Sequence, residues 1–145
     1  PYLIVDNEMV TALCLAAKSG VDVRILTPGV PDKWYVYYVT QSYYPRLLEA
    51  GVRIYEYTPG FVHAKMYVSH DREAIVGSAN MDYRSLYLHF ENCCAFYGGH
   101  MVRDVLEDVR ATLAESHEVT MADVLRTPLY KWLAQVFLRF FSPLM

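Results

Sequence analysis

The sequence predicts an α/β domain in which a mixed β-sheet is flanked by helices. Short apolar runs bounded by turn residues alternate with stretches whose apolar residues recur at helical spacing, and this alternation is typical of layered α/β domains. The chain has 145 residues, of which 54% are hydrophobic, and that is enough to bury one core. We expect the α/β domain over residues 1–117 and a C-terminal helical segment over residues 118–145.

The first half of the chain is predicted to alternate strands and helices. Asp6 or Asn7 can cap the first helix, and Gly20 and Gly51 are expected to end the first and second helices. Because the first five residues resemble the end of a buried strand, we expect the chain to begin inside a larger protein. The expected elements, in order, are a strand over 1–5, a helix from Asp6 or Asn7 to about Ser19, a strand over 21–26, a loop over 27–32, a helix over 33–50 and a strand over 52–57.

The second half is predicted to contain three more strands and a helix. Gly77 is expected to end one of these strands, and Gly98 and Gly99 to end the last of them. The expected elements, in order, are strands over 62–69, 73–76 and 92–97 and a helix over 100–116.

Composition and charge exclude several classes of protein. The net charge is −3 and the pI is about 5.9, which argues against a protein that binds nucleic acid backbones. Cys14, Cys93 and Cys94 have neither the number nor the spacing of a disulfide framework or a zinc site, which fits a reducing compartment. The sequence has no secretory signal and no apolar run long enough to span a bilayer.

The last stretch of the chain is predicted to be a helix with a narrow polar stripe. Thr127 can cap it, with Pro128 in the first helical position. Lys131, Gln135 and Arg139 recur at every fourth position, and most of the other residues are apolar or aromatic. Such a helix could lie in a membrane interface, or it could pack on this domain or on a partner domain; the sequence leaves both open.

Four tyrosines fall in the expected helix over residues 33–50. They could line a channel for a lipid or a headgroup, although such a run more often forms the packed aromatic face of a helix. The tyrosines are Tyr37, Tyr38, Tyr43 and Tyr44.

The residues that indicate chemistry lie on two neighbouring segments. His63 and Lys65 are two positions apart, so in a strand they project to the same side. The turn at Gly77, Ser78 and Asn80 follows the next strand and can fold back beside them. Lys65 can bind a phosphate as a point charge, Ser78 and Asn80 can donate to its oxygens, and Gly77 allows a close approach of the backbone. The set predicts a site that holds a phosphodiester.

His63 can attack phosphorus, giving a phosphohistidine, or can protonate the leaving alkoxide. Either role requires its second ring nitrogen to be oriented, and Glu91 is the candidate for that task. The alternative is that His63 and Lys65 are solvated residues on an edge strand. Five residue types at fixed spacing favour the catalytic interpretation.

These residues resemble the H-x-K-x4-D-x6-G-S-x-N signature of the phospholipase D superfamily. The stretches from Thr58 to Lys65 and from Asn80 to Ser85, with Phe90-Glu91 after them, resemble the C-terminal half of a bacterial cardiolipin synthase. The closing Arg139-Phe140-Phe141-Ser142-Pro143-Leu144 also resembles the end of that family, so the resemblance covers essentially the whole chain.

The resemblance implies a phospholipase D-like layered fold and a specific reaction. In that family two halves face each other, one histidine attacks the phosphatidyl phosphorus, and the other acts as acid and then base. A phosphatidyl group passes from one phosphatidylglycerol to another, giving cardiolipin, and neither a metal nor a cofactor is needed. The implied partners are the phosphatidylglycerol substrate, a membrane surface, and a second half in the parent chain or a homodimer partner. The implied location is the bacterial cell membrane.

One position departs from the signature. The motif aspartate falls at position 70, where this chain has His70, with Asp71 next to it. In the family this aspartate is thought to support the site, and Asp71 is the candidate to replace it. We expect His63, Lys65, Ser78 and Asn80 to form a competent half-site.

Two other functions remain as alternatives. The first is a phosphodiesterase or nuclease of the same superfamily that acts as a homodimer, although the acidity of the chain makes nucleic acid an unlikely partner. The second is a decayed, non-catalytic half, for which His70 is the only sequence evidence.

Overall fold

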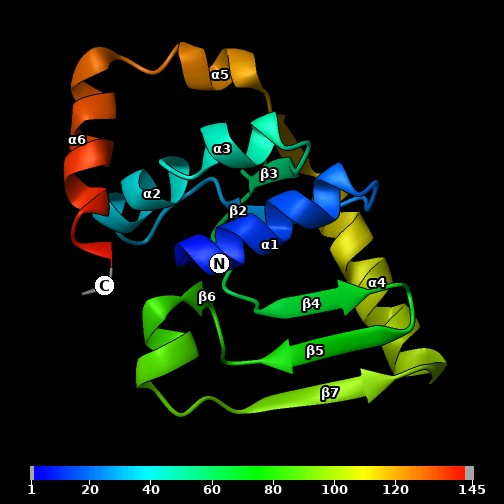
Figure 1. Cartoon of the computed structure of the whole chain (residues 1–145). Helices are drawn as coiled ribbons and strands as arrows, with labels where there is room; N and C mark the ends of the chain where they lie inside the picture. The colour runs from blue at the N-terminus through cyan, green and yellow to red at the C-terminus, as the bar shows by residue number, and fades with distance from the viewer. Residues whose placement is uncertain (1, 143–145) are drawn as a thin grey trace.

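The computed structural model describes residues 2–142 (Figure 1). Pro1, expected in the first strand, and Pro143 and Leu144, which resemble the family's end, lie outside these residues. The elements are, in order, β1 (Leu3–Ile4), α1 (Asn7–Lys18), β2 (Arg24–Pro28), α2 (Trp34–Gln41), α3 (Tyr44–Glu49), β3 (Arg53–Tyr57), β4 (Met66–Ser69), β5 (Glu73–Gly77), β6 (Met81–Asp82), the π-helix η1 (Arg84–Leu88), β7 (Cys93–Tyr97), α4 (Gly99–Ala114), β8 (Ser116–Val119), α5 (Met121–Leu125) and α6 (Leu129–Arg139).

The strands form three groups, so the expected mixed α/β architecture is confirmed. Strands β2 and β3 are parallel, and β8 joins β3 in the antiparallel sense. Strands β4, β5 and β7 form an antiparallel sheet in that order, and β1 pairs with β6 in parallel. Helix α4 packs against the β4–β5–β7 sheet, while α1, α2 and α3 lie near β1, β2 and β3 (Figure 1).

Two apolar clusters hold these layers together. The larger is built by β1, α1, the β2–β3 pair and helices α2 and α3, and the fully buried Tyr44 and Leu47 belong to it. The smaller lies between α4 and the β4–β5–β7 sheet, where Ala74, Val102 and Val105 are its buried members. The sheet that carries the motif residues therefore rests on the smaller core.

The first helix follows the prediction closely. The Asp6 side chain accepts a hydrogen bond from the Met9 N–H at 2.8 Å, which satisfies one of the free N–H groups at the helix start. Val10 is fully buried, and Gly20 follows the helix with φ +91°, a conformation that suits glycine. The cap, the buried position and the stop were all readable from the sequence.

The single helix expected over 33–50 was wrong, because the chain forms two helices with a break at Ser42 and Tyr43. Pro45 explains the break. Proline has no N–H, and its ring clashes with the carbonyl four residues earlier, so it cannot lie in a helix interior. Here Pro45 lies in the first turn of α3, where its missing N–H costs nothing. The break lets Tyr43 and Tyr44 enter the core, so these two tyrosines pack the interior.

Two expected strands begin later than predicted. Strand β2 begins at Arg24 because its pairing with β3 begins there, opposite Arg53, and Val21 is left about half exposed. The strand expected over 62–69 begins at Met66 and pairs with Val76 of β5. His63 and Lys65 therefore lie in an irregular segment just before β4.

The C-terminal part contains two elements that were not predicted. Strand β8 pairs with β3 from Ile54 to Tyr57, so the expected boundary between residues 117 and 118 falls inside a paired strand. Thr120 then starts α5 with a capping box to Asp123. The next helix begins after Pro128, and Thr127 does not cap it. No helix within residues 2–142 has both the length and the apolar character needed to cross a bilayer.

Candidate active site

His63 and Lys65 form the first part of the candidate site. The Lys65 Nζ lies 2.8 Å from His63 Nε2 and also donates to the His63 carbonyl oxygen at 2.8 Å. The Phe61 ring stacks on the imidazole with a centroid separation of 5.5 Å. His63 is exposed and Lys65 is half-buried. His63 and Lys65 are thus brought together as predicted, although they lie in an irregular segment and not in a strand.

Ser78 and Glu91 form the second part. The Ser78 N–H donates to the Asn92 carbonyl at 3.0 Å, and the Asn92 N–H donates to Ser78 Oγ at 3.0 Å. The Ser78 hydroxyl donates to the Glu91 carboxylate. These bonds fix the hydroxyl at the end of β5 beside the start of β7.

Two hydrogen bonds to backbone carbonyls hold the two parts together. The Gly77 N–H donates to the Lys65 carbonyl at 3.2 Å, and the Tyr67 hydroxyl donates to the Ala79 carbonyl at 2.9 Å. A side chain at Gly77 would not fit, because a Cβ there would lie 2.6 Å from the Cys93 Cα. The glycine thus allows β5 and β7 to approach at the point where the motif residues leave the sheet.

Asn80 lies in the turn that follows, and its neighbours were missed by sequence reasoning. Its N–H donates to Ser85 Oγ at 3.1 Å, and the Ser85 N–H donates to the buried Asp82 carboxylate at 2.7 Å. An aspartate that accepts from the N–H three residues later is a recognisable local motif, so the spacing of Asp82 and Ser85 was a usable signal. Asn80 Oδ1 is buried and has no hydrogen-bond partner among residues 2–142, a feature that demands an explanation in a folded protein.

The charged groups around the site shift one another's pKa values. Partial burial lowers the pKa of the Lys65 ammonium, and the carboxylates of Glu91 and Asp82 oppose that shift. The hydrogen bond from Ser78 lowers the pKa of Glu91, with a smaller contribution from Ser85. The site therefore pairs a cation with a carboxylate that stays ionised at neutral pH.

Glu91 does not have the contact expected of it. Its carboxylate accepts from the Ser78 hydroxyl, and no hydrogen bond to His63 is present within the described part of the chain. The reason is local: Glu91 directly precedes Asn92, whose backbone carbonyl and N–H are both hydrogen-bonded to Ser78. Glu91 is thus placed to orient the serine.

The structure places Asp71 away from the site that it was expected to support. His70 and Asp71 lie in the turn between β4 and β5, at the opposite end of β4 from His63 and Lys65. Both have φ +53°, the left-handed conformation in which aspartate and asparagine are enriched. Asp71 contacts Arg110 of α4 at 3.4 Å. The departure from the signature at His70 therefore lies in a hairpin turn, at the far end of β4 from His63 and Lys65.

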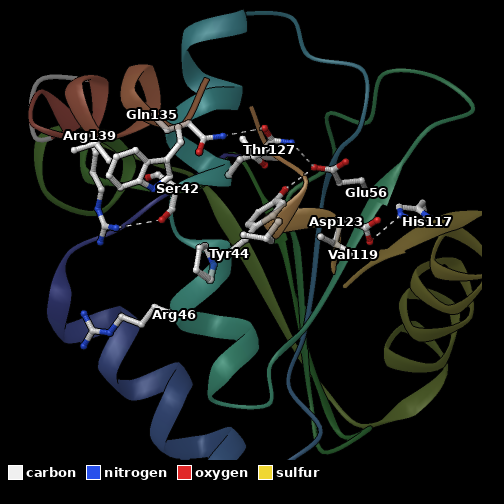
Figure 2. Close-up of a pocket in the computed structure, with 15 residues that line it drawn as sticks. Ser42, Tyr44, Arg46, Glu56, His117, Val119, Asp123, Thr127, Gln135 and Arg139 are labelled. Atoms are coloured by element: carbon white, nitrogen blue, oxygen red, sulfur yellow. Dashed lines mark hydrogen bonds and ion pairs between the residues drawn. The ribbon is translucent and has the colours of Figure 1, made fainter. Parts of the chain in front are cut away.

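A cavity of about 470 Å³ lies elsewhere, bordered by α2, α3 and α6 (Figure 2). Glu56 lies in its lining and accepts hydrogen bonds from Gln41 Nε2 at 3.1 Å and from the Tyr44 hydroxyl at 3.0 Å. No motif residue belongs to this lining. The chemistry thus belongs to the open site at the ends of β4 and β5, and the cavity is a separate feature.

The open site has the groups that phosphoryl transfer needs. It offers an imidazole as nucleophile or acid, an ammonium as a charge for phosphate, and a hydroxyl as a donor to phosphate oxygens. Its residues are exposed or half-buried, so one side of a bound phosphate would face water unless a second surface covered it.

Comparison with known proteins places this arrangement in a family. A family model described as "Cardiolipin synthase, PLD-like domain" matches residues 1–113. Cardiolipin synthase 2 of Bacillus anthracis is 40% identical over 145 residues, which is 100% of this chain and 28% of that protein. Cardiolipin synthase of Geobacillus kaustophilus is 51% identical over 114 residues, which is 76% of this chain and 23% of that protein. The chain thus spans less than a third of the length of these relatives.

A solved structure agrees with the fold. The phospholipase D family member Nuc from Salmonella typhimurium aligns with a TM-score of 0.68 at 18% identity, over 81% of this chain and 77% of that one. At that identity the match establishes the fold alone. The fold, the motif residues gathered at the ends of β4 and β5, and the family match over residues 1–113 lead to one conclusion: the chain belongs to the phospholipase D-like domains of the cardiolipin synthase family.

Proposed function

We propose that this chain supplies one half of the active site of a phosphatidyltransferase, which makes cardiolipin and glycerol from two molecules of phosphatidylglycerol. The observation that carries the proposal is the contact between Lys65 Nζ and His63 Nε2, at 2.8 Å, beside a serine held by Glu91. An imidazole nitrogen, an ammonium and a hydroxyl within one small region suit an anionic phosphodiester. The family match supports the choice of lipid.

The reaction needs two histidines, of which His63 is one. In the first step an imidazole lone pair forms a P–N bond with the phosphatidyl phosphorus, and the P–O bond to the glycerol headgroup breaks. The second histidine gives its proton to the departing glycerol oxygen. It then takes the proton of a hydroxyl on a second phosphatidylglycerol, whose oxygen attacks phosphorus as the P–N bond breaks. A second H-x-K half, in the full-length protein or in a second copy, would supply the other histidine.

Lys65 and Ser78 stabilise the charge that develops on the non-bridging oxygens. Lys65 is partly desolvated, which lowers its pKa and strengthens its attraction for a phosphate, because charges interact more strongly away from water. Glu91 would hold Ser78 in place throughout. The second half would also cover the open side and limit attack by water, which would otherwise divert the intermediate to phosphatidic acid.

The test uses the full-length protein in phosphatidylglycerol vesicles, with cardiolipin, glycerol and phosphatidic acid followed by mass spectrometry. We expect cardiolipin and glycerol to form in equal amounts. The variant His63→Ala should lose this activity by several orders of magnitude, because it removes a reacting group. The matched control is His100→Ala, which changes an exposed histidine at the start of α4.

The outcomes separate the candidate functions. Phosphatidic acid without cardiolipin would contradict transfer and indicate a hydrolase. Cardiolipin that persists in His63→Ala would exclude this half-site as the catalyst, and no product from a folded full-length protein would indicate a non-catalytic half. If the transfer is seen, a phosphatidyl group trapped on His63 after a rapid quench would identify it as the nucleophile, and a trap on the other histidine would identify His63 as the acid.

A further inference from the structure

Helix α6 is packed the opposite way from an ordinary surface helix. In most amphipathic helices the apolar face packs on the protein and the polar face meets water. In α6 the polar stripe Lys131, Gln135 and Arg139 faces the domain, and the apolar side faces outward. Figure 1 shows the helix at the edge of the molecule, with α2 on its inner side.

The inner face of α6 is held by polar and cation–π contacts. Gln135 is buried and its Nε2 lies 3.4 Å from Gln41 Oε1. The Lys131 Nζ lies 5.1 Å from the centre of the Tyr38 ring. Arg139 donates to a backbone carbonyl of the α2–α3 break, at Ser42, and its guanidinium lies 4.3 Å from the centre of the Tyr43 ring. All three stripe residues are thus engaged, so the helix is attached to the domain by its polar side.

The outer face of α6 is apolar and exposed. We define it by four residues that follow one side of the helix at spacings of three and four: Tyr130, Leu133, Phe137 and Phe140. Their exposed fractions are 73%, 53%, 65% and 89%. Burying side chains of this size is worth about 1.5–3 kcal/mol each, so a continuous row of them exposed to water indicates a surface that is covered in use.

The charged residues of the C-terminal segment beyond Asp123 are all basic. After Asp123 the chain contains Arg126, Lys131 and Arg139 and no acidic residue, whereas the chain as a whole carries a net charge of −3. This C-terminal segment is therefore basic and apolar on an acidic protein. Lys131 and Arg139 lie on the inner side of α6 and Arg126 lies before its start, and all three are close enough to a surface beneath this single helix to attract it, since screening at physiological salt acts over about 8–10 Å. That combination is complementary to an anionic lipid surface, which attracts basic residues and accepts apolar and aromatic side chains.

The helix also ends close to the candidate active site. Leu138 of α6 and Tyr83 pack against the same apolar cluster, and the charge of Arg139 opposes the rise in pKa that burial causes at Tyr83. Tyr83 directly follows Asp82, whose carboxylate holds Ser85 and through it Asn80. In Figure 1, α6 and the site-bearing ends of β4, β5 and β7 lie toward the same side of the molecule.

We propose that the outer face of α6 inserts into the interfacial layer of an anionic phospholipid bilayer and so holds the active site at the lipid surface. The proposal rests on the proposed function for its choice of lipid over protein as the occupant, since a phosphatidyl donor resides in such a bilayer. The polar stripe fixes the helix on the domain, and the outer face lies in the plane of the interface.

The first test places a fluorescent reporter on the outer face. The full-length variant Leu133→Trp is mixed with vesicles of phosphatidylglycerol whose acyl chains are brominated. Insertion predicts quenching beyond that of the unmodified protein. Leu15→Trp is the matched control, because Leu15 is a leucine in the last turn of α1, 60% exposed, and it should add no quenching. Equal behaviour of the two reporters would overturn the proposal.

The second test removes the apolar character of the face. In the Leu133→Trp reporter, a further Phe137→Glu should raise the lipid concentration for half-maximal quenching about tenfold, since it removes an aromatic ring that would insert into the bilayer and adds repulsion. Leu15→Glu in the same reporter should leave that concentration unchanged. Phosphatidylcholine vesicles should require about tenfold more lipid than phosphatidylglycerol vesicles. No dependence on Phe137 would overturn the proposal.

The tests are independent of catalysis. Quenching in the reporter that also carries His63→Ala should equal that of the active protein, so insertion can be seen even if the proposed reaction is wrong. A reporter that stays unquenched in a protein that makes cardiolipin would overturn only the proposal for α6. An unquenched reporter that is instead protected from an aqueous quencher would show that the face is covered by protein, and this too would contradict insertion.

Discussion

At the scale of single residues, each reactive side chain of the candidate site is held in place by its own set of neighbours. Ser78 is held by Glu91 and by Asn92, while His63 is held by Lys65 and by the Phe61 ring. The residue types of the motif and their proximity in the fold could be predicted from the sequence. The partner of Glu91 could not be predicted, because it depends on the hydrogen bonds between Ser78 and Asn92, which form only when β5 and β7 pair.

We predict that Glu91→Ala lowers the proposed phosphatidyl transfer at least about tenfold, because it removes the charged acceptor that holds the Ser78 hydroxyl. The pKa of Glu91 is lowered from its ordinary value of 4.5. Its folded pKa is below its unfolded pKa, so the restraint on Ser78 is present above pH 4.5 and is lost as the pH falls through the lowered value. A pH profile of kcat should show this acid limb in the parent protein and not in Glu91→Ala. An unchanged rate of transfer in Glu91→Ala would show that Glu91 has no part in the reaction.

We predict that His70→Asp, which restores the signature, leaves the rate of transfer within about twofold of the parent. Position 70 lies in the β4–β5 turn, away from His63 and Lys65. The free energy of unfolding should change by less than about 0.5 kcal/mol, as is usual for exposed positions. Steady-state kinetics and chemical denaturation measure both quantities. A tenfold gain in rate would mean that the turn acts on the site after all.

At the scale of secondary-structure elements, the approach of β5 to β7 positions the site. Gly77 occupies the last position of β5, and its lack of a side chain allows Cys93 of β7 to lie against it. The sequence predicted that Gly77 ends this strand but assigned the glycine to a close approach of phosphate. The structural reason is the packing of two strands, which a single sequence does not reveal.

We predict that Gly77→Ala destabilises the fold by about 1–3 kcal/mol, the usual cost of an overpacked contact, and displaces Ser78. Gly60→Ala is the matched control, because a Cβ at Gly60 would meet nothing within 4 Å, and it should be nearly neutral. Thermal unfolding of the two variants compares them directly. Equal stability of the two proteins would contradict the packing argument.

Elements with local signals were predicted well, and elements created by tertiary pairing were not. Asp6, Val10 and Gly20 predicted the start, the buried face and the end of α1. Pro45 indicates the break between α2 and α3, although the expected helix ran through it. Strand β8 has no clear alternation in Ser-His-Glu-Val, and it exists because β3 offers it a partner. The direction in which α6 presents its faces depends on the tyrosines of α2 and the α2–α3 break, so the pattern of α6 alone left both possibilities open.

At the scale of the whole molecule, the two apolar clusters are unequal. The larger one has thirteen buried residues among those described, and the smaller one has three. The smaller cluster supports the β4–β5–β7 sheet, so the motif-bearing part of the fold rests on little buried apolar surface of its own.

We predict that the β4–β5–β7 sheet opens locally at a free energy at least about 2 kcal/mol below that of the β2–β3 pair. Native-state hydrogen exchange on the chain would measure this. The amides of Val68 and Ile75, which lie within the sheet ladder, should exchange faster than those of Ile25 and Ile54 in the other ladder. Equal protection in both sheets would show that the two clusters unfold as one unit.

The contact between Lys65 and His63 has a consequence for when the protein can react. An ammonium has hydrogens to donate and no lone pair. The imidazole nitrogen 2.8 Å from it must therefore accept this hydrogen bond with its own lone pair. In the resting molecule that pair is therefore occupied. In the proposed reaction, an anionic phosphate would draw the ammonium to its own oxygens and release the lone pair. The negative charge of the substrate would then free His63 as the substrate arrives, and a neutral molecule would leave the lone pair occupied.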